Sequence, residues 1–584
     1  MQTIVDLIEK SYSRFTGKAA LRHKINDAWQ DISYESFWNA SARIAAGLVK
    51  NGFKVGDHAA LLAPSSPRWV IAYLGILKAG GIVIPIDKEL KSIELQHILL
   101  DCDASVLFTD NPCFETVLEI VDSLPPLCRI VTLNPTLAQD DCNTSSLIRA
   151  MGKGQDRQVS FQSFAELLQN SPLSPVPRSS SDIAVILYTS GTTGRSKGAM
   201  LSHGNIVSNI QGAVAHLSLD ESIHTLSILP INHVFEQVCG VLLPLSLGGT
   251  VSFCESLKKI GDNLSEVKPT FFLGVPALYR MLLDRIMKKI RDKALSHVLF
   301  SFPMTRPLVT SKIGQTFGTG TIFISGGAAL DPAIAAGLEK LGLTLLQGYG
   351  TTETSPIISA ECAAHRRLGS VGRLLPGIEV RIDTPDEEMV GEILVRGPNV
   401  MQGYYKNSQA TAEVLEDGWY RTGDLGRLDR DGFLTLSGRA RNLIVTPNGK
   451  NVYPEEVENE LLKSPFIAET VVYGQKVAPV TEEIHALIHP NMESLEEYAR
   501  KQGKCELTPA EVEALLRAEV HTFCSGLANY KRIKKITICG DEFPKTTTRK
   551  IKRFVVEEDI LQNMGAQMQT QIKETSVAWH RWEK

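Results

Sequence analysis

The first 130 residues alternate two patterns of apolar and polar side chains. Residues 36–50 repeat apolar side chains at the three- and four-residue spacing of a helix that buries one face. Residues 58–63 form a continuous apolar run, which predicts a buried strand. The same two patterns recur as a helix over residues 69–79 and a strand over residues 82–86. This alternation of strands and helices predicts an open α/β sheet.

The segment 171–182, SPLSPVPRSSSD, contains prolines and serines that disfavour both helix and ladder pairing. We expect a loop there between two subdomains, followed by a second α/β region. Short strands with many glycines over residues 391–436 predict a small β-rich subdomain. We therefore expect an α/β protein with a large N-terminal domain over residues 1–438, built from layered α/β subdomains and the β-rich one. A small, mobile α+β domain is expected over residues 439–584.

The composition, with 43% hydrophobic and 22% charged residues, is that of a globular protein, and 584 residues predict about three or four compact units. The formal net charge of -4 gives no general attraction to polyanions, so nucleic acid is not expected as a partner. No apolar stretch approaches the roughly 20 residues that span a bilayer, and the N-terminus lacks the pattern of a signal peptide. The ten cysteines form no CxxC pair, which favours reduced thiols in a cytoplasmic protein.

A glycine-rich segment over residues 188–198, YTSGTTGRSKG, follows a five-residue apolar run. Successive backbone N–H groups in such a loop can surround a phosphate, and Lys197 adds positive charge. The Walker pattern G-x-x-x-x-G-K-[ST] fails because Ser196 stands where the second glycine belongs and Gly198 follows the lysine. We interpret the segment as a polyphosphate loop of another kind; a polar surface loop is the alternative.

This segment resembles, nearly residue for residue, the signature of the adenylate-forming superfamily, which includes acyl-CoA synthetases, peptide-synthetase adenylation domains and firefly-type luciferases. The family usually has proline at the position of Ser196. The family's other motifs follow in order along the chain. The resemblance implies these nucleotide contacts: Thr189, Ser190, Gly191, Thr192, Thr193, Gly194, Lys197, Gly326, Gly327, Ala328, Tyr349, Gly350, Asp424 and Arg439.

The segment 346–353, LQGYGTTE, resembles the second signature of the family. By that resemblance Tyr349 stacks on adenine and Thr352 binds the α-phosphate. Glu353 holds Mg²⁺, with Thr189 as a second metal contact. A hard cation of this kind prefers carboxylate and phosphate oxygens. The alternative is that Tyr349 is a packed turn residue.

Two further motifs resemble the ribose and adenine contacts of the family. The glycine-rich segment 326–330, GGAAL, follows a predicted strand over residues 322–325 and is expected to form a wall of the adenine pocket. In WYRTGD, residues 419–424, Asp424 is expected to accept hydrogen bonds from the ribose hydroxyls, with Arg439 as the second ribose contact.

The C-terminal part resembles the mobile domain of the family. Arg441 occupies the hinge, Gly449 lies in the loop that admits the pantetheine arm of CoA, and Lys550 aligns with the lysine that bridges the carboxylate and the α-phosphate. The sequence departs from the family at Asn442, where an acidic residue is common, and at Arg549, where glycine is usual. The basic residues between 531 and 553 are a candidate for peripheral contact with a membrane.

The acid is suggested by two apolar motifs. In residues 228–236, ILPINHVFE, His233 resembles the residue that closes over the acid carboxylate, although a histidine on an apolar stretch is more often a core residue. Residues 270–279, TFFLGVPALY, resemble a segment of long-chain acyl-CoA synthetases. An apolar pocket around it would suit a fatty chain, at about 0.8 kcal/mol per buried methylene.

The resemblance implies a long-chain fatty acid:CoA ligase that uses ATP and Mg²⁺. A medium- to long-chain fatty acid would form acyl-AMP with release of pyrophosphate, and CoA would then take the acyl group. A fatty acyl-AMP ligase or an acyl-carrier-protein ligase would share nearly every motif. A luciferase-like oxidoreductase and a nucleotide-binding pseudoenzyme are alternatives of another class. The chain length of the acid and the oligomeric state stay open.

Overall fold

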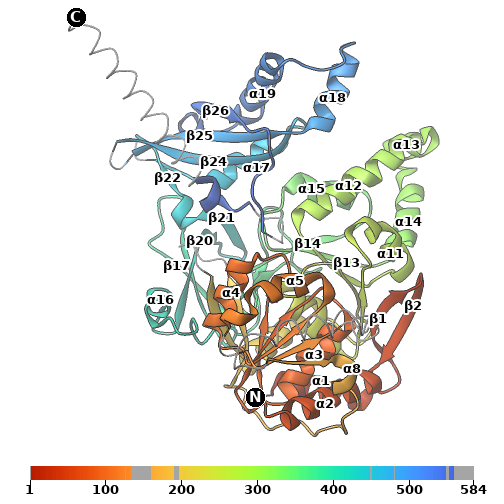
Figure 1. Ribbon diagram of the computed structural model, residues 1–584. Coiled ribbons are helices and arrows are strands. Elements are labelled where there is room, and N and C mark those ends of the chain that lie inside the picture. The colour runs from red at the N-terminus through yellow and green to blue at the C-terminus, as the bar shows by residue number, and fades with distance from the viewer. Residues whose placement is uncertain are drawn as a thin grey trace, which may run out of the picture. The chain divides into compact units, whose positions relative to one another are not determined.

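The computed structural model describes residues 2–124, 127–133, 159–189, 196–447, 450–478, 481–546 and 551–557 (Figure 1). The chain divides into two compact units. The first comprises Met1–Asp383, Ile393–Thr422 and Leu428–Thr435, and the second comprises Thr384–Glu392, Gly423–Arg427 and Leu436–Lys584. Because the second unit takes two short segments from upstream, the division is not a single cut in the sequence.

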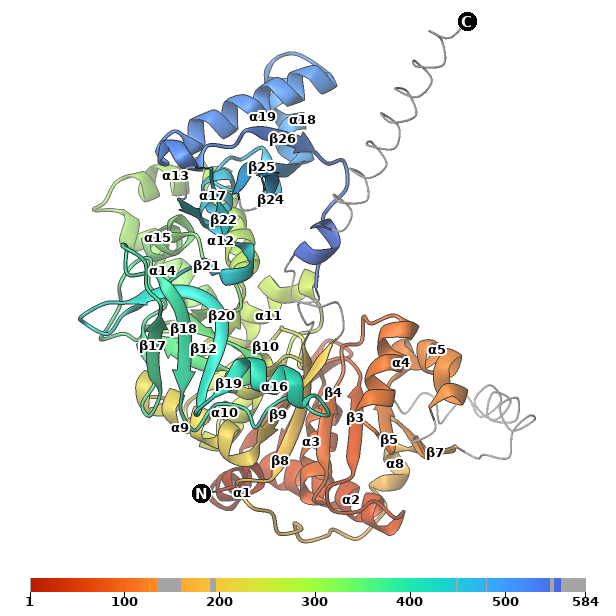
Figure 2. The ribbon, with the colours of Figure 1, turned by 90° about the vertical axis from the view of Figure 1, so that its left-hand side faces the viewer.

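A seven-stranded sheet in the first unit has the order β7-β6-β5-β3-β4-β8-β9. Neighbouring strands are parallel except β8 and β9, which form an antiparallel pair (Figure 2). The strands are β3 (His58–Leu62), β4 (Ile82–Pro85), β5 (Val106–Thr109), β6 (Arg129–Thr132), β7 (Ser160–Ser163), β8 (Ile183–Thr189) and β9 (Lys197–Ser202).

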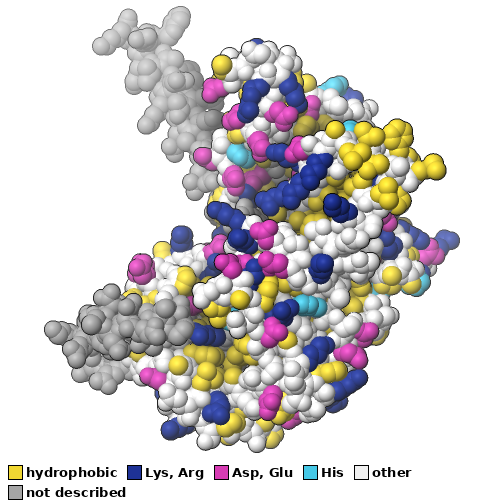
Figure 3. All heavy atoms as spheres, turned by 90° about the vertical axis from the view of Figure 1, so that its right-hand side faces the viewer, with side chains coloured by type: hydrophobic (Ala, Val, Ile, Leu, Met, Phe, Trp, Pro, Cys, Tyr) yellow, Lys and Arg dark blue, Asp and Glu magenta, His cyan; other side chains and the backbone are white. Residues whose placement is uncertain are grey.

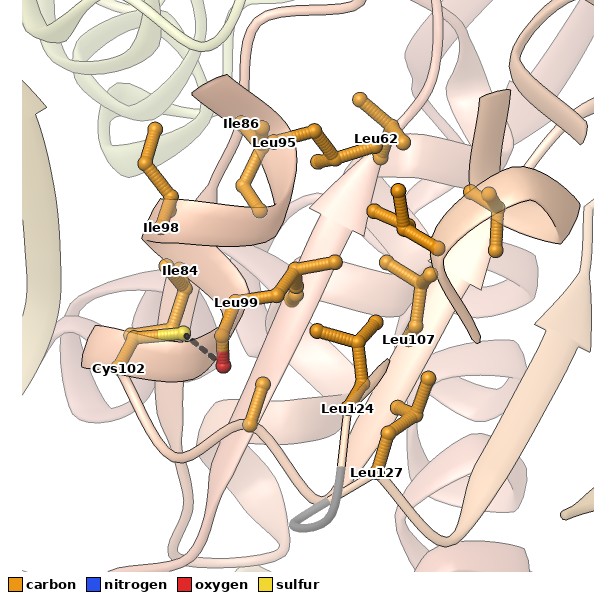
Figure 4. Close-up of a cluster of buried hydrophobic side chains, with 14 of the residues drawn as sticks. Leu62, Ile84, Ile86, Leu95, Ile98, Leu99, Cys102, Leu107, Leu124 and Leu127 are labelled. Atoms are coloured by element: carbon orange, nitrogen blue, oxygen red, sulfur yellow. Dashed lines mark hydrogen bonds between the residues drawn. The ribbon is translucent and has the colours of Figure 1, made fainter. Parts of the chain in front are cut away.

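Helices cover this sheet as the sequence pattern predicts. α4 (Ser92–Asp101) and α5 (Asn111–Ile120) pack on it through a cluster of buried aliphatic side chains (Figure 4). α2 (Tyr34–Lys50) begins after Ser33, whose side chain accepts a hydrogen bond from the Ser36 N–H. α3 (Pro67–Lys78) is buried almost throughout because it packs against α2, against β3 and β4, and against a strand of a second sheet. The predicted α/β alternation is confirmed.

The second sheet has nine strands in the order β16-β15-β14-β13-β12-β10-β11-β1-β2. The strands from β1 to β14 in this order are all parallel to one another. The three strands at the sheet edges pair antiparallel: β2 with β1, β15 with β14, and β16 with β15. The strands are β1 (Ala19–Ile25), β2 (Ala28–Ser33), β10 (His224–Ser227), β11 (Thr250–Phe253), β12 (Phe271–Gly274), β13 (Ile322–Ser325), β14 (Leu345–Gly350), β15 (Ile357–Ala360) and β16 (Arg373–Leu374).

The segment 171–182 leads from the end of α8 (Phe164–Leu167) into β8. The segment has no helix or strand, as expected, but it leads into β8, which pairs with β4 of the same sheet that precedes the loop. The N-terminal strand β1 instead joins the second sheet, pairing with β11. The proline-rich composition predicts an interruption of regular structure, but it holds no information about which sheet the next strand enters.

Helices and single turns connect the strands of the first unit. A π-helix, η2 (Phe235–Leu242), follows the β10 end, and a 3-10 turn, η4 (Thr352–Thr354), follows β14. The remaining helices are α1 (Ile4–Arg14), α8 (Phe164–Leu167), α9 (His203–Leu217), α10 (Leu243–Leu247), α11 (Ile260–Val267), α12 (Pro276–Arg291), α13 (Ala294–Ser301), α14 (Arg306–Phe317), α15 (Pro332–Lys340) and α16 (Ser408–Val414).

The predicted β-rich region is also present. It forms a sheet of order β17-β18-β20-β19 in which β21 pairs with β20. These strands are β17 (Glu379–Asp383), β18 (Gly391–Arg396), β19 (Leu415–Glu416), β20 (Trp419–Leu428) and β21 (Leu434–Arg439). The division between the two units passes through β18, β20 and β21.

The second unit has its own core around a three-stranded sheet of order β24-β25-β26, against which α17 and α19 pack. Its elements are the 3-10 turn η5 (Ala440–Asn442), β22 (Ile444–Val445), β23 (Asn451–Val452), α17 (Pro454–Leu461), β24 (Ile467–Ala478), β25 (Thr481–Pro490), α18 (Met492–Lys501), α19 (Pro509–Cys524) and β26 (Lys535–Ile538). Within the described ranges, no helix has the length and apolar character required to cross a bilayer, and every cysteine is a free thiol.

Candidate active site

The carboxyl ends of parallel strands in the nine-stranded sheet bring several predicted residues to one edge. Gly274 of β12 is in register with Ser325 of β13, which is in register with Gln347 of β14. Chain segments that leave neighbouring parallel strands at this end form the usual ligand crevice of an open α/β sheet. Tyr349 and Gly350 end β14, and the predicted residues that follow β13 and β14 are Gly326, Gly327, Ala328, Thr352 and Glu353.

Gly326 lies directly against the ring of Phe235. A Cβ atom on Gly326 would stand 2.9 Å from that ring, so only glycine lets the two segments approach this closely. Gly327, with a φ of +81°, then turns the chain outward. Phe235 begins the π-helix, two residues after the half-buried His233, so the predicted adenine wall and the predicted acid-side segment are neighbours.

The turn after β14 depends on Gly350. A Cβ atom on Gly350 would overlap the carbonyl oxygen of Pro356. The pairing of β14 with β15 shifts register between Tyr349 and Gly350, which redirects the chain towards Thr352 and Glu353. Tyr349, only 9% exposed, is therefore held at a fixed bend.

Residues 402–405 run alongside strand β9 and join it through an isolated antiparallel bridge between Ala199 and Tyr404. The Met200 N–H donates to the Gly403 carbonyl over 2.9 Å, and the Tyr405 N–H donates to the Gly198 carbonyl over 2.8 Å. Strand β9 also packs against the η4 turn. Tyr404 is thereby placed between the strand that leaves the glycine-rich loop and the turn that holds Glu353.

The Tyr404 side chain joins two residues that the sequence analysis identified separately. Its hydroxyl donates a hydrogen bond to Glu353 Oε1 over 2.9 Å, and Lys197 Nζ lies 5.4 Å from its ring centre. Burial raises the pKa of Tyr404, and the negative charge of Glu353 raises it further, so the hydroxyl stays protonated. Sequence reasoning missed Tyr404 because its only signal was a Gly-Tyr-Tyr string that belonged to no quoted motif.

The two strands that flank the glycine-rich loop are paired up to its base. Thr189 is the β-ladder partner of Lys197, and its hydroxyl donates to the Lys197 carbonyl over 3.5 Å. Both predicted residues are therefore at the end of the β8–β9 hairpin. The predicted contacts Ser190, Gly191, Thr192, Thr193 and Gly194 lie outside the described residues.

In the second unit, Asp424 and Arg439 form an ion pair. Arg439 Nε lies 2.7 Å from Asp424 Oδ1, and Asp424 is only 8% exposed. The resemblance assigned both residues to the ribose, so the pair joins the two predicted contacts. Asn442, one of the departures from the family pattern, donates from Nδ2 to Glu455 Oε1 over 2.7 Å. Gly449, Lys550 and the second departure, Arg549, lie outside the described residues.

Family models match both parts of the chain. The model described as AMP-binding enzyme matches residues 8–405, and the model described as AMP-binding enzyme C-terminal domain matches residues 456–550. The chain belongs to the AMP-binding enzyme family. The order of the quoted motifs along the sequence is thus accounted for by common ancestry.

Two curated relatives of this AMP-binding enzyme share a name. The long-chain-fatty-acid–CoA ligase FadD15 of Mycobacterium bovis is 28% identical, and the alignment covers 93% of each chain. The long-chain-fatty-acid–CoA ligase ACSBG1 of Homo sapiens is 29% identical, over 81% of this chain and 69% of the relative. Among solved structures, ATP-bound MatB from Rhodopseudomonas palustris superposes with a TM-score of 0.74 at 27% identity, covering 96% of this chain and 99% of that one.

Glu353 of the AMP-binding enzyme is a carboxylate suited to a metal at this edge. In the described part of the chain, no three His, Cys, Asp or Glu side chains gather as a metal cluster. Mg²⁺ usually keeps several waters and is bound through one or two carboxylates together with substrate phosphates. The half-buried Glu353, oriented by Tyr404, fits this requirement without a dedicated protein cage.

A buried carboxyl group lies next to the predicted acid side of the AMP-binding enzyme. Glu236, on the π-helix, is 1% exposed, and its Oε1 has no hydrogen-bond partner among the described residues. Burial raises the pKa of Glu236 to about 8, so the carboxyl group is mostly protonated at neutral pH. Sequence reasoning quoted this residue only as the end of a motif, because a glutamate on an apolar stretch does not reveal its burial.

Within the segment 270–279, residues 271–274, Leu278 and Tyr279 are buried in the core, whereas Thr270 and Ala277 are exposed. Phe271–Gly274 is fully buried as β12, and the Tyr279 hydroxyl donates to the Ile324 carbonyl over 2.9 Å. Tyr279 thereby ties α12 to β13. An acyl pocket beside this segment would be apolar, as the sequence predicts, because the surrounding cluster consists of aliphatic and aromatic side chains.

Proposed function

We propose that this enzyme activates a medium- to long-chain fatty acid with ATP in the cytoplasm and transfers the acyl group to CoA. The observation that supports adenylation most directly is the Lys197–Tyr404–Glu353 cluster beside the end of the nine-stranded sheet. The choice of a fatty acid as the substrate and of CoA as the acceptor is supported by the name that the two relatives share.

The chemical requirement is to make a carboxylate reactive. The carboxylate attacks the α-phosphorus of ATP, pyrophosphate leaves, and the resulting acyl-AMP is a mixed anhydride that a thiol can open. Thr352 and Lys550 are proposed to hold the α-phosphate, with Lys550 also on the acid carboxylate. His233 is proposed to close over that carboxylate. Mg²⁺, when bound by Glu353, Thr189 and the phosphates, would neutralise phosphate charge.

The nucleotide is proposed to lie along the same edge of the sheet. Tyr349 would stack on adenine against the wall formed by residues 326–328, next to the bend at Gly350. Lys197 and residues 189–194 would surround the phosphates. Asp424 would accept hydrogen bonds from the ribose hydroxyls, with Arg439 beside it.

One site must serve two reactions, so the second unit is proposed to change its orientation about Arg441. In one orientation it would present Lys550 for adenylation. In the other it would present the loop of Gly449, whose lack of a side chain leaves room for the pantetheine arm. This movement would separate the two half-reactions in time.

The reaction is tested with labelled palmitate, ATP and either CoA or a carrier protein. We expect palmitoyl-CoA and pyrophosphate. If palmitate were transferred to the carrier protein and no palmitoyl-CoA formed, the acceptor would be a carrier protein and not CoA. If no acid in a panel from acetate to stearate caused release of pyrophosphate, adenylation would be rejected. Within this assay, Lys550→Ala should abolish adenylation but leave thioester formation from supplied palmitoyl-AMP, whereas exposed Lys535→Ala should change neither.

A further inference from the structure

The chain between β12 and β13 exposes an apolar face that the proposed reaction does not use. Leu295 and Val298, at the i, i+3 spacing of one face of α13, are 73% and 51% exposed, and Phe302, directly after the helix ends at Ser301, is 62% exposed. Met304 and Leu308, in the next turn and α14, are 94% and 67% exposed. A helix normally turns such a stripe towards the core, so an outward stripe marks an interaction surface.

The outward stripe is separate from the face that holds the helices in place. Phe300, Val309 and Ile313 pack from α13 and α14 against the core of the nine-stranded sheet. These two helices therefore already have a partly buried face, and the exposed one is additional. Figure 3 views the side of the molecule that has α13 and α14, and hydrophobic side chains gather there next to Lys and Arg side chains.

The same stretch of chain is strongly basic. Residues 284–312 contain two acidic residues, Asp284 and Asp292, against a larger set of basic ones. The basic residues are Arg285, Lys288, Lys289, Arg291, Lys293, Arg306 and Lys312. The whole protein has a net charge of -4, so this local excess is opposite in sign to the molecule as a whole.

The basic segment over residues 531–553 differs because several of its charges are paired with carboxylates. Lys531 lies 2.6 Å from Glu456, and both Lys545 and Arg553 form ion pairs with glutamates of their own unit. Three of its basic side chains are therefore paired with carboxylates locally. The surface formed by α13, α14 and the end of α12 is the better candidate for contact with a membrane.

We propose that this α12–α14 surface docks on a bilayer that contains anionic phospholipid. Leu295, Val298, Phe302 and Met304 would enter the boundary between headgroups and acyl chains, while the flanking lysines and arginines would contact phosphates. A second copy of this chain fits less well, because a symmetric contact would bring two basic surfaces together.

Vesicle sedimentation tests this surface with the full-length protein and no substrates. Vesicles of phosphatidylcholine and phosphatidylglycerol should bind the wild-type protein, and Leu295→Glu/Phe302→Glu should weaken binding at least about tenfold. Lys288→Glu/Lys289→Glu should reduce the preference for phosphatidylglycerol over phosphatidylcholine alone by about fivefold or more. The control variant Ile93→Glu/Leu368→Glu changes two apolar side chains that are 82% and 67% exposed outside this surface, and it should bind as the wild type does.

Three outcomes would overturn the proposal. Wild type could fail to sediment with either vesicle, or the Leu295→Glu/Phe302→Glu variant could bind as wild type does. In sedimentation velocity without vesicles, a concentration-dependent dimer that this variant loses would assign the surface to a second copy. Because binding is measured without ATP or CoA, none of these results depends on the proposed reaction, which pyrophosphate release tests separately.

Discussion

The Tyr404 hydroxyl donates a hydrogen bond to Glu353 Oε1 over 2.9 Å. The backbone around Tyr404 is bonded to β9, and β9 begins at Lys197, where the glycine-rich loop ends. The orientation of the Glu353 carboxylate is therefore coupled to the strand that follows the phosphate loop. Tyr404 therefore links the two family signatures, which are distant in sequence.

Replacing Tyr404 by phenylalanine should impair adenylation. A hydrogen bond to a charged group contributes about 1.5–3 kcal/mol, which corresponds to a fall in kcat of about 10- to 160-fold. Because the tyrosine acts by positioning Glu353, the Mg²⁺ concentration for half-maximal rate should also rise. Pyrophosphate release as a function of Mg²⁺ measures both effects.

Tyr405→Phe is the matched control. Its hydroxyl donates to Asp103 Oδ2 over 3.1 Å on the surface, away from Glu353. This variant should keep wild-type kcat and Mg²⁺ dependence. Equal losses in the two variants would show that Tyr404 has only a structural role.

Gly350→Ala should destabilise the first unit. The new methyl group would overlap the Pro356 carbonyl oxygen, and backbone on both sides must move to relieve the overlap. We expect the free energy of unfolding to fall by about 3 kcal/mol or more, measured by denaturant titration. At Gly348, on the same strand, the nearest atom to an added Cβ is 3.7 Å away, so Gly348→Ala should cost much less. Comparable losses in the two variants would contradict the structure of this bend.

Glu236 should make stability depend on pH. In the unfolded chain the carboxyl group loses its proton above its ordinary pKa of 4.5, whereas burial keeps the folded one protonated up to about pH 8. The folded state thus binds more protons in this window, so the free energy of unfolding falls as pH rises from 5 to 8 and levels off above it. Relative to Glu236→Gln, wild type should lose on the order of 3 kcal/mol across the window.

Urea titrations of both proteins at several pH values measure this difference. Glu115→Gln, at an exposed position on α5, serves as the control and should run parallel to wild type. If wild type and Glu236→Gln keep a constant difference from pH 5 to pH 8, the folded carboxyl is already ionised in that range.

Asp424→Asn should weaken ATP binding. The substitution removes the acceptor charge proposed for the ribose and leaves Arg439 without the carboxylate that now lies 2.7 Å from its Nε. We expect KM for ATP to rise about tenfold or more, with a smaller change in kcat. Asp383→Asn breaks a similar ion pair with Arg421, 3.0 Å long, and should leave KM for ATP unchanged. An unchanged KM in Asp424→Asn would remove this residue from the nucleotide site.

The local structure was largely predictable from sequence. Periodicity identified α2, β3, α3 and β4 because each buries a continuous face or run of apolar side chains. The resemblance identified the residues at the strand ends because the motifs are contiguous strings.

Relationships between distant segments were not predictable in the same way. Tyr404 meets Glu353 only because residues 402–405 pair with β9, and no local pattern encodes that pairing. The burial of Glu236 and the outward stripe of α13 likewise depend on what the rest of the fold covers. The pairing of β1 with β11 of the second sheet likewise follows from the whole fold and not from a local pattern.

The pairing of β1 with β11 also has a consequence for synthesis. Leu21 is in register with Val251, so the strand made among the first residues finds its partner only after much of the first unit has left the ribosome. At about 5–20 residues per second, β1 waits on the order of 10–45 s with one edge unpaired. During that interval the edge of β1 opposite β2 is unpaired, and chaperone shielding would protect it from aggregation.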